Sequence, residues 1–496
     1  MSIRRHTLYN FFGTILPLAT SLVTVPIYLR LVGETRYGIL AIVWLLLGYF
    51  GLFDLGLGRA TAQRIAALQE GTPTDRAHTF WTALILNVSL GGVGGLIIWP
   101  VAAYFFRHVF KIDEALRPEI LAAVPWLIMA VPMATLTGVL TGALQGRGRF
   151  LELNLISVTG TLLFQILPLI VARYLGVSLG VLVPVALLAR VLTVTVLFFQ
   201  CWRNVFNGHK IVYEHEKAGD LLRLGGWITV SSFVSPMMVI LDRFIIGSLF
   251  GAKAISWYTV PFQLAERTTI ISTSHTAALF PHLAAATIDK EKQLIDNALR
   301  TIMAITTPLI SIGILLMTPF LAWWITPDFA QRSSLVGRIL LMGFWANGLA
   351  AIPYSLLQAR GRPDIVAKCH LSELIPYFIL LYIGLYTNGI IGAAIVFSVR
   401  VLVDLVLLGS VSGILKRSLH LFLVPSILLV IAFIIASEIS SGRTGWYLIG
   451  LIHIVISVFL SWRINPGQKK ILINDQLNMI VKRIGLFTKK AFKLNN

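Results

Sequence analysis

The sequence predicts an all-α polytopic membrane protein with about fourteen transmembrane helices, and three observations support this fold class. The 496 residues are 56% hydrophobic and only 13% charged, whereas soluble domains carry about 25% charged residues. The apolar residues gather in runs close to the roughly 20 residues that a spanning helix needs. Most charged residues lie in the short intervals between these runs.

Each apolar run is expected to form one spanning helix. The runs lie near 8–30, 37–58, 79–106, 119–143, 151–173, 177–200, 225–250, 254–283, 301–325, 335–358, 365–386, 389–413, 419–437 and 445–462. The intervals contain no P-loop and no long segment that would form a soluble catalytic domain. We therefore expect neither an enzyme nor an ATP-driven pump.

The basic residues predict the orientation in the membrane. With the N-terminus in the cytoplasm, the inside loops hold more than twice as many Lys and Arg residues as the outside loops. An even number of helices then places both termini in the cytoplasm. The net charge of +19 is explained by these loops, so we expect no nucleic-acid partner. The two cysteines, Cys201 and Cys369, predict neither a disulfide framework nor a metal site.

A repeated hexamer indicates that the chain has two related halves. LQGRGR occupies 144–149 and LQARGR occupies 357–362, an offset of 357 − 144 = 213. Two glycine pairs and one arginine pair recur at similar offsets: Gly33 with Gly251 (251 − 33 = 218), Gly176 with Gly389 (389 − 176 = 213) and Arg190 with Arg400 (400 − 190 = 210). Two parallel six-helix lobes with a substrate site between them are a recurring transporter architecture.

The repeat predicts the domain organisation. We expect an N-lobe over 1–205, a cytoplasmic linker over 206–222 and a C-lobe over 223–415, with two further helices over 416–463. The tail, 464–496, mixes basic and apolar residues at roughly helical spacing. It is expected to lie on the anionic inner leaflet as an amphipathic helix, with a partner-docking helix as the alternative.

Four stretches resemble the Wzx-type polysaccharide and oligosaccharide flippases of the multidrug/oligosaccharidyl-lipid/polysaccharide (MOP) exporter superfamily. They are NFFGTILPLATSLVTVPIYLRLVGETRYGI, GLFDLGLGRATAQRIA, LTGALQGRGRF and ILDRFIIGSLFGAKAISWYTVPFQL. The resemblance implies two pseudo-symmetric six-helix bundles around a central cavity, plus two C-terminal helices.

The same resemblance implies a function. An isoprenoid (undecaprenyl) pyrophosphate-linked oligosaccharide would move from the cytoplasmic to the outer leaflet of the bacterial inner membrane by alternating access. The product would serve the synthesis of O-antigen, capsule or exopolysaccharide, with polysaccharide polymerase and chain-length proteins as partners.

Ionisable residues within predicted spans are candidate site residues, because a charge in the membrane is costly and usually faces a cavity or a partner. Arginine matches phosphate oxygens with two parallel hydrogen bonds. We therefore expect the pyrophosphate to be held by Arg190, Arg400, Arg243 and Arg267. The alternative is a set of structural ion pairs, such as Arg400 with Asp404 at i,i+4. Asp54, near the inner end of the second span, is expected to cap its helix or pair with Arg59.

Coupling to a H⁺ or Na⁺ gradient is expected to use an embedded titratable group; we expect no other cofactor and no bound metal. The candidates are Asp242, Glu266, Asp404 and His275. The alternative for Asp242 with Arg243 is a structural clamp between two helices, and for His275 a packing role.

Prolines and basic turns complete the candidate residues. A proline removes a backbone hydrogen bond and can bend its helix, so Pro17, Pro26 and Pro236 are expected to be gating bends. The arginines that could meet the headgroup at the inner leaflet are Arg59, Arg147, Arg149, Arg360 and Arg362. For those in the hexamers, fixing the topology of tight cytoplasmic turns is the expected main role.

The sequence also bears on three alternative functions. A drug or small-solute antiporter of the same superfamily fits the helices, but several embedded arginines favour an anionic lipid over a cationic drug. A glycan polymerase would need a long outer loop bearing acid and base groups, which the sequence lacks. A flippase for the peptidoglycan precursor stays open.

Overall fold

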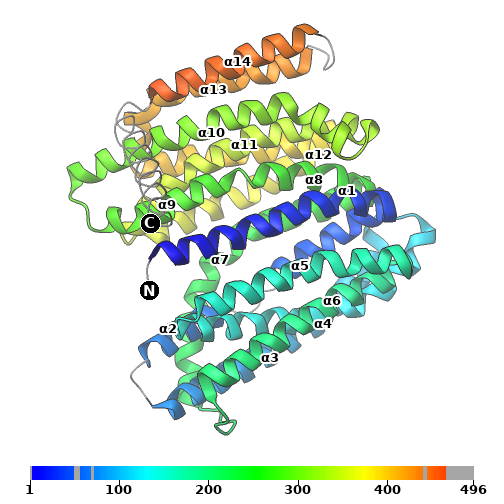
Figure 1. Cartoon of the computed structure of the whole chain (residues 1–496), viewed down its shortest axis with the longest axis vertical. Coiled ribbons are helices and arrows are strands. Elements are labelled where there is room, and N and C mark those ends of the chain that lie inside the picture. Colours follow the sequence, from blue (N-terminus) through cyan, green and yellow to red (C-terminus); the bar gives the residue numbers. More distant parts are fainter. Residues whose placement is uncertain (1–2, 50–55, 69–71, 439–443, 465–496) are drawn as a thin grey trace, which may run out of the picture. The chain divides into compact units, whose positions relative to one another are not determined.

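The computed structural model describes residues 3–49, 56–68, 72–438 and 444–464. Side chains are described for 16–45, 56–68, 72–222, 237–238, 241–416, 418–438 and 445–463. The described part of the chain contains helices and no strand (Figure 1). The predicted tail, 464–496, and Asp54 lie outside the side chains that are described.

The helices follow the order of the predicted spans. The first half contains α1 (Ile3–Tyr49), α2 (Leu57–Ala67), α3 (Pro73–Tyr104), α4 (Arg117–Gly146), α5 (Phe150–Tyr174) and α6 (Leu179–Cys201). The second half contains α7 (His215–Phe250), α8 (Ala252–Glu266), α9 (Thr269–Ala284), α10 (Ile288–Trp324), α11 (Pro327–Ala359), α12 (Pro363–Val411), α13 (Ile414–Glu438) and α14 (Thr444–Ile464). Ten segments of the described chain are long and apolar enough to cross a membrane. The predicted class, an all-α polytopic membrane protein, is confirmed.

Helices α1 and α12 each contain two predicted spans. Gly33 interrupts α1 with φ 78° and ψ 164°, and Gly389 interrupts α12 with φ 57° and ψ −143°. The rings of Tyr28 and Trp44 lie 5.0 Å apart, although 16 residues of straight helix would separate them by about 24 Å. The chain therefore folds back at Gly33, where only glycine adopts this left-handed conformation without strain.

The eighth predicted span, 254–283, is two helices rather than one. Helix α8 ends at Glu266 and α9 begins at Thr269. The hydroxyl of Thr268 donates to the carbonyl of Ala265, and that of Thr269 donates to the carbonyl of Glu266, each at 2.7 Å. Such local bonds compete with the backbone hydrogen bonds of a helix. The pattern of apolar residues does not reveal them, so the sequence predicts one helix here.

The chain divides into two compact units. One consists of residues 1–260 and 374–393, and the other of residues 261–373 and 394–496. In the first unit, buried apolar side chains of α2, α3, α4 and α6 form a common core that includes Leu57, Phe80, Leu140 and Leu197. The predicted lobe boundaries, 1–205 and 223–415, follow the internal repeat and stay a prediction.

The two hexamers adopt the same turn with the same hydrogen bonds. The glycine at the fifth position has φ 69° at Gly148 and φ 71° at Gly361. The backbone N–H groups of Arg149 and Arg362 each donate at 2.9 Å to the leucine carbonyl five residues earlier. Beyond each turn, one arginine side chain reaches a distant carbonyl: Arg147 donates to Asn204 at 3.1 Å, and Arg360 donates to Ser412 at 3.2 Å.

Candidate functional site

Arg190 lies on α6, 11 residues from the first residue of that helix, or roughly 16 Å along its axis. Its guanidinium stands over the ring of Phe164 on α5, 4.9 Å from the ring centroid. None of the described side chains forms an ion pair or a hydrogen bond with it. A guanidinium in this setting gains attraction from the ring face and keeps its five N–H donors for another group.

Aromatic rings continue from Phe164 toward the turn at Gly33. Phe164 meets Trp44 with ring centroids 6.2 Å apart, and Trp44 meets Tyr28 at 5.0 Å and Tyr37 at 5.8 Å. The hydroxyl of Tyr28 donates to the backbone carbonyl of Gln165 at 2.8 Å. We call Tyr28, Tyr37, Trp44 and Phe164 the aromatic column.

Arg400 lies in a different environment. Its Nε donates to Oε2 of Glu373 at 3.0 Å, and both side chains are more than nine-tenths buried. Four residues further along α12, Asp404 Oδ1 lies 3.4 Å from His370 Nε2. The imidazole of His370 stacks on the ring of Tyr354, a residue of α11, at 6.3 Å. Arg400 and Asp404 therefore do not form the i,i+4 pair that was the alternative from the sequence. Each instead pairs with a residue from the first half of α12, Arg400 with Glu373 and Asp404 with His370.

This network holds more negative charge than fixed positive charge. Its two carboxylates, Glu373 and Asp404, face one guanidinium and one imidazole that is charged only when protonated. The second oxygen of Glu373, Oε1, is buried, and no described group donates a hydrogen bond to it. A buried carboxylate oxygen without a donor is costly, and one H⁺ or another small cation would balance the charge.

Asp242 and Arg243 form a closed pair. Nη1 of Arg243 lies 2.8 Å from Oδ1 of Asp242, and the hydroxyl of Tyr258 donates to Oδ2 at 3.2 Å. Both charged side chains are essentially inaccessible to solvent. Tyr258 is a residue of α8, so this clamp connects α7 with α8, as the structural alternative from the sequence expects.

The remaining intramembrane candidates lie apart from these clusters. Glu266 and Arg267 are exposed where α8 gives way to α9, and no described residue forms an ion pair with either. His275 is half-buried on α9. Pro17 and Pro26 lie inside α1, and the side chain of Pro236 lies outside the described ones.

Four of the five candidate arginines at the inner leaflet have partners within the chain. Arg149 pairs with Glu152 at 3.2 Å and Arg362 with Asp364 at 3.1 Å, while Arg360 forms a two-bond pair with Glu291 at 2.6 and 3.1 Å. Arg147 bonds a backbone carbonyl, as described above. Arg59, on α2, is exposed.

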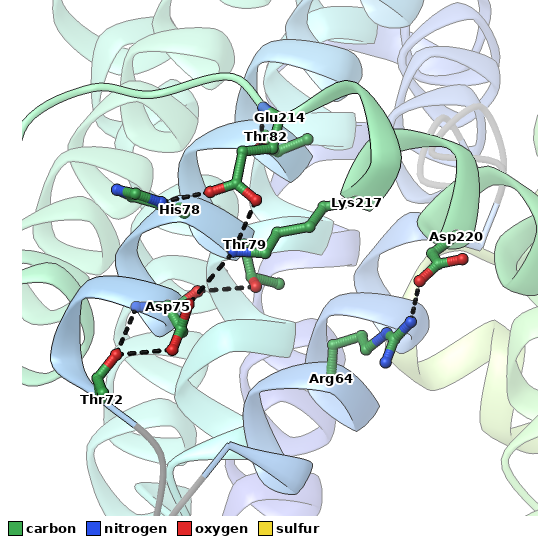
Figure 2. Close-up of polar contacts among 9 residues, drawn as sticks. All are labelled: Arg64, Thr72, Asp75, His78, Thr79, Thr82, Glu214, Lys217 and Asp220. Carbon is green, nitrogen blue, oxygen red and sulfur yellow. Dashed lines mark hydrogen bonds and ion pairs between the residues drawn. The ribbon is translucent and has the colours of Figure 1, made fainter.

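A network of charges fastens the start of α7 to α2 and α3 (Figure 2). Glu214 accepts from Lys217 at 2.9 Å and contacts His78, and its backbone N–H donates to Thr82 at 3.1 Å. Asp220 pairs with Arg64. The Lys217 ammonium, with a smaller contribution from His78, holds the pKa of Glu214 below its usual range. This network lies at the end of the predicted linker, 206–222, where the sequence predicts a loop.

Sequence reasoning missed Glu373 and His370, the partners of Arg400 and Asp404. Both lie within the eleventh predicted span, 365–386, near the end that is expected to face the cytoplasm. The available signal was the spacing of His370 and Glu373, since residues three apart share one face of a helix.

Comparison with known proteins places this fold among polytopic transporters. The family model described as "Polysaccharide biosynthesis protein" matches residues 27–334. A "Putative O-antigen transporter" of Shigella flexneri is 30% identical over 410 residues, which cover 82% of this chain and 97% of the relative. The chain therefore belongs to the polysaccharide biosynthesis protein family, as a Wzx-type member of the MOP exporter superfamily.

Two solved structures share the fold at low sequence identity. "Lipid II flippase MurJ, inward closed conformation" has a TM-score of 0.68 and 15% identity, and the match covers 95% of this chain and 99% of that one. The "Inward-facing conformation of a multidrug resistance MATE family transporter of the MOP superfamily" has a TM-score of 0.66 and 17% identity, with coverage of 85% and 96%.

Proposed function

We propose that this protein is a flippase that moves isoprenoid pyrophosphate-linked oligosaccharide from the cytoplasmic to the outer leaflet of a bacterial inner membrane. The relative named as an O-antigen transporter, matched along 97% of its length, supports a surface polysaccharide as the end product. In this proposal the chain transports its substrate by alternating access and catalyses no covalent step.

One observation carries the assignment of an anionic substrate. Arg190 is a permanent cation at mid-helix depth, and among the described side chains its guanidinium faces an aromatic ring rather than a carboxylate. A pyrophosphate supplies the concentrated negative charge that such a guanidinium binds with two parallel hydrogen bonds. A cationic drug would be repelled from the same place.

Arg400 and its partners are assigned to ion coupling rather than to the headgroup. Arg400 already bonds Glu373, whereas Oε1 of Glu373 is a buried acceptor with no described donor. We assign H⁺ as the coupling ion, carried by the Glu373–Asp404 pair. Asp404 was a candidate from the sequence, and Glu373 extends that assignment.

The test is surface glycan in cells that depend on this gene. Arg190→Ala should abolish surface glycan at normal protein level, since the variant loses one contact with an aromatic ring and leaves no described carboxylate unpaired. Arg190→Lys keeps a positive charge without the fork of donors and should restore part of the glycan. The matched control is Arg173→Ala, on the neighbouring helix α5 at its outer end, which should leave glycan unchanged. Full glycan with Arg190→Ala would refute the headgroup assignment.

A further inference from the structure

The aromatic column next to Arg190 carries polar atoms that the chain leaves unbonded. The Tyr37 hydroxyl, the Trp44 indole Nε1 and the Gln165 side-chain Oε1 are all buried, and no described group forms a hydrogen bond with any of them. Leaving a polar atom buried and unpaired is costly. Tyr37 and Trp44 contact each other, and Gln165 follows Phe164 in α5 and bonds Tyr28 through its backbone carbonyl, so three such atoms lie on or next to the column.

The position of these atoms matches that of Arg190. Trp44 lies 11 residues after the turn at Gly33, Phe164 lies 10 residues before the end of α5, and Arg190 lies 11 residues after the start of α6. These separations correspond to depths of roughly 15–17 Å along each helix. Tyr28 and Tyr37 lie within five residues of Gly33. The aromatic column thus begins beside the arginine and runs toward the turn.

The chemistry of the set fits a sugar ring. A pyranose presents an apolar C–H face, which packs on flat aromatic rings, and hydroxyl groups, each of which both donates and accepts. The unbonded atoms comprise a donor on Trp44, an acceptor on Gln165 and a hydroxyl on Tyr37 that does either. Aromatic and apolar side chains with a few polar groups are the usual lining of a small-molecule site.

We infer that Tyr37 and Trp44 of the aromatic column, together with the adjacent Gln165, form a subsite for a sugar ring of the transported headgroup, beside the pyrophosphate held by Arg190. This inference rests on the proposed function. Arg190 binds the pyrophosphate, which all isoprenoid pyrophosphates share. The column binds the sugar, which only the lipid-linked oligosaccharide carries. The subsite therefore selects sugar-bearing lipid over bare isoprenoid pyrophosphate.

The test compares two lipid probes on the purified protein in phosphatidylglycerol nanodiscs. One probe is undecaprenyl pyrophosphate, and the other is the same lipid carrying a single hexosamine. Trp44→Phe, Gln165→Leu and Tyr37→Phe should each weaken binding of the sugar-bearing lipid about tenfold and leave binding of the bare lipid unchanged. Arg190→Gln should weaken binding of both.

A matched control separates ligand binding from packing. Trp81 on α3 also has a buried Nε1 that no described group bonds, and it packs against Phe80 and Phe206 at 5.6 and 4.9 Å. Trp81→Phe should change neither affinity. Because Tyr37→Phe removes a hydroxyl that bonds nothing described, a purely structural role predicts unchanged or higher thermal stability and unchanged affinity.

One set of results would overturn the sugar subsite alone, and a different result would overturn the proposed flippase function. If the wild type binds both lipids equally, or if the three variants weaken both equally, the sugar subsite is wrong while the flippase proposal stands. If the wild type binds neither lipid above the phosphatidylglycerol background, the proposed function itself fails.

Discussion

Two arginines that the predicted internal repeat pairs with each other, Arg190 and Arg400, have opposite surroundings. Arg400 bonds a buried carboxylate at 3.0 Å and belongs to a four-residue network. Arg190 stands over a phenyl ring, and no described carboxylate pairs with it. Arg190 lies on α6, which is separate from α5, whereas Arg400 lies on α12, which continues across the turn at Gly389, and each half supplies different partners. A paired arginine stabilises the fold, and an arginine with free donors is available to a ligand.

The largest expected effect concerns stability. Arg400→Ala leaves Glu373 as an unpaired carboxylate in a buried site, which typically costs 3–5 kcal/mol, so the melting temperature and the amount of folded protein should fall sharply. Arg190→Ala should leave both near wild type. Thermal unfolding in detergent measures the difference.

A double variant tests the reason for that loss. Arg400→Met combined with Glu373→Gln removes both charges and should recover most of the lost stability. An equal fall in melting temperature for Arg190→Ala and Arg400→Ala would contradict the contrast between the two arginines.

A second prediction separates coupling from substrate binding. Glu373→Gln keeps the shape of the side chain and removes its titratable proton. Transport in proteoliposomes should lose its acceleration by an imposed proton gradient, while binding of isoprenoid pyrophosphate should stay within about twofold of wild type. His275→Gln is the control on a half-buried histidine outside the network. A gradient response that survives Glu373→Gln would remove this network from the coupling proposal.

The smallest effect is expected where the charges are exposed. Because the pKa of Glu214 is lowered in the folded protein, its charge stabilises the fold above the unfolded value of about 4.3. This contribution is lost as the pH falls through the lowered folded pKa. Glu214→Gln should therefore lower the melting temperature slightly at pH 7, corresponding to at most about 1 kcal/mol.

The same variant should approach the wild type as the pH falls below the lowered pKa of Glu214 in the folded protein. Unfolding curves of both proteins between pH 3 and pH 7.5 measure this dependence. A gap that widens as the pH falls would show that the Lys217 and His78 contacts do not stabilise the Glu214 carboxylate.

The sequence predicts the fold class and most spans well because they depend on local properties. Long apolar runs follow from the thickness of the membrane, and the hexamers match in sequence because the turns they form are the same. The break between α8 and α9 depends on threonine hydroxyls that bond the backbone, and hydropathy does not contain that information.

The partners of the charged residues were harder to predict. Whether Arg400 pairs with Asp404 or with Glu373 depends on how α12 folds back at Gly389. That fold brings together residues 27 positions apart, and spacing along a single helix gives no sign of it. Arg190 was identified from its position in a span, but its aromatic neighbours come from two other helices, α1 and α5.

The hexamer turns have an evolutionary consequence. In each turn, one arginine side chain donates a hydrogen bond to a backbone carbonyl near the end of the same half. These bonds join Arg147 to Asn204 and Arg360 to Ser412. Each copy produced by a gene duplication would thus have inherited the means to close its own bundle. In our proposal, the mid-helix arginines of the two copies then came to serve different tasks, with Arg400 beside the carboxylates that hold a proton and Arg190 binding an anion.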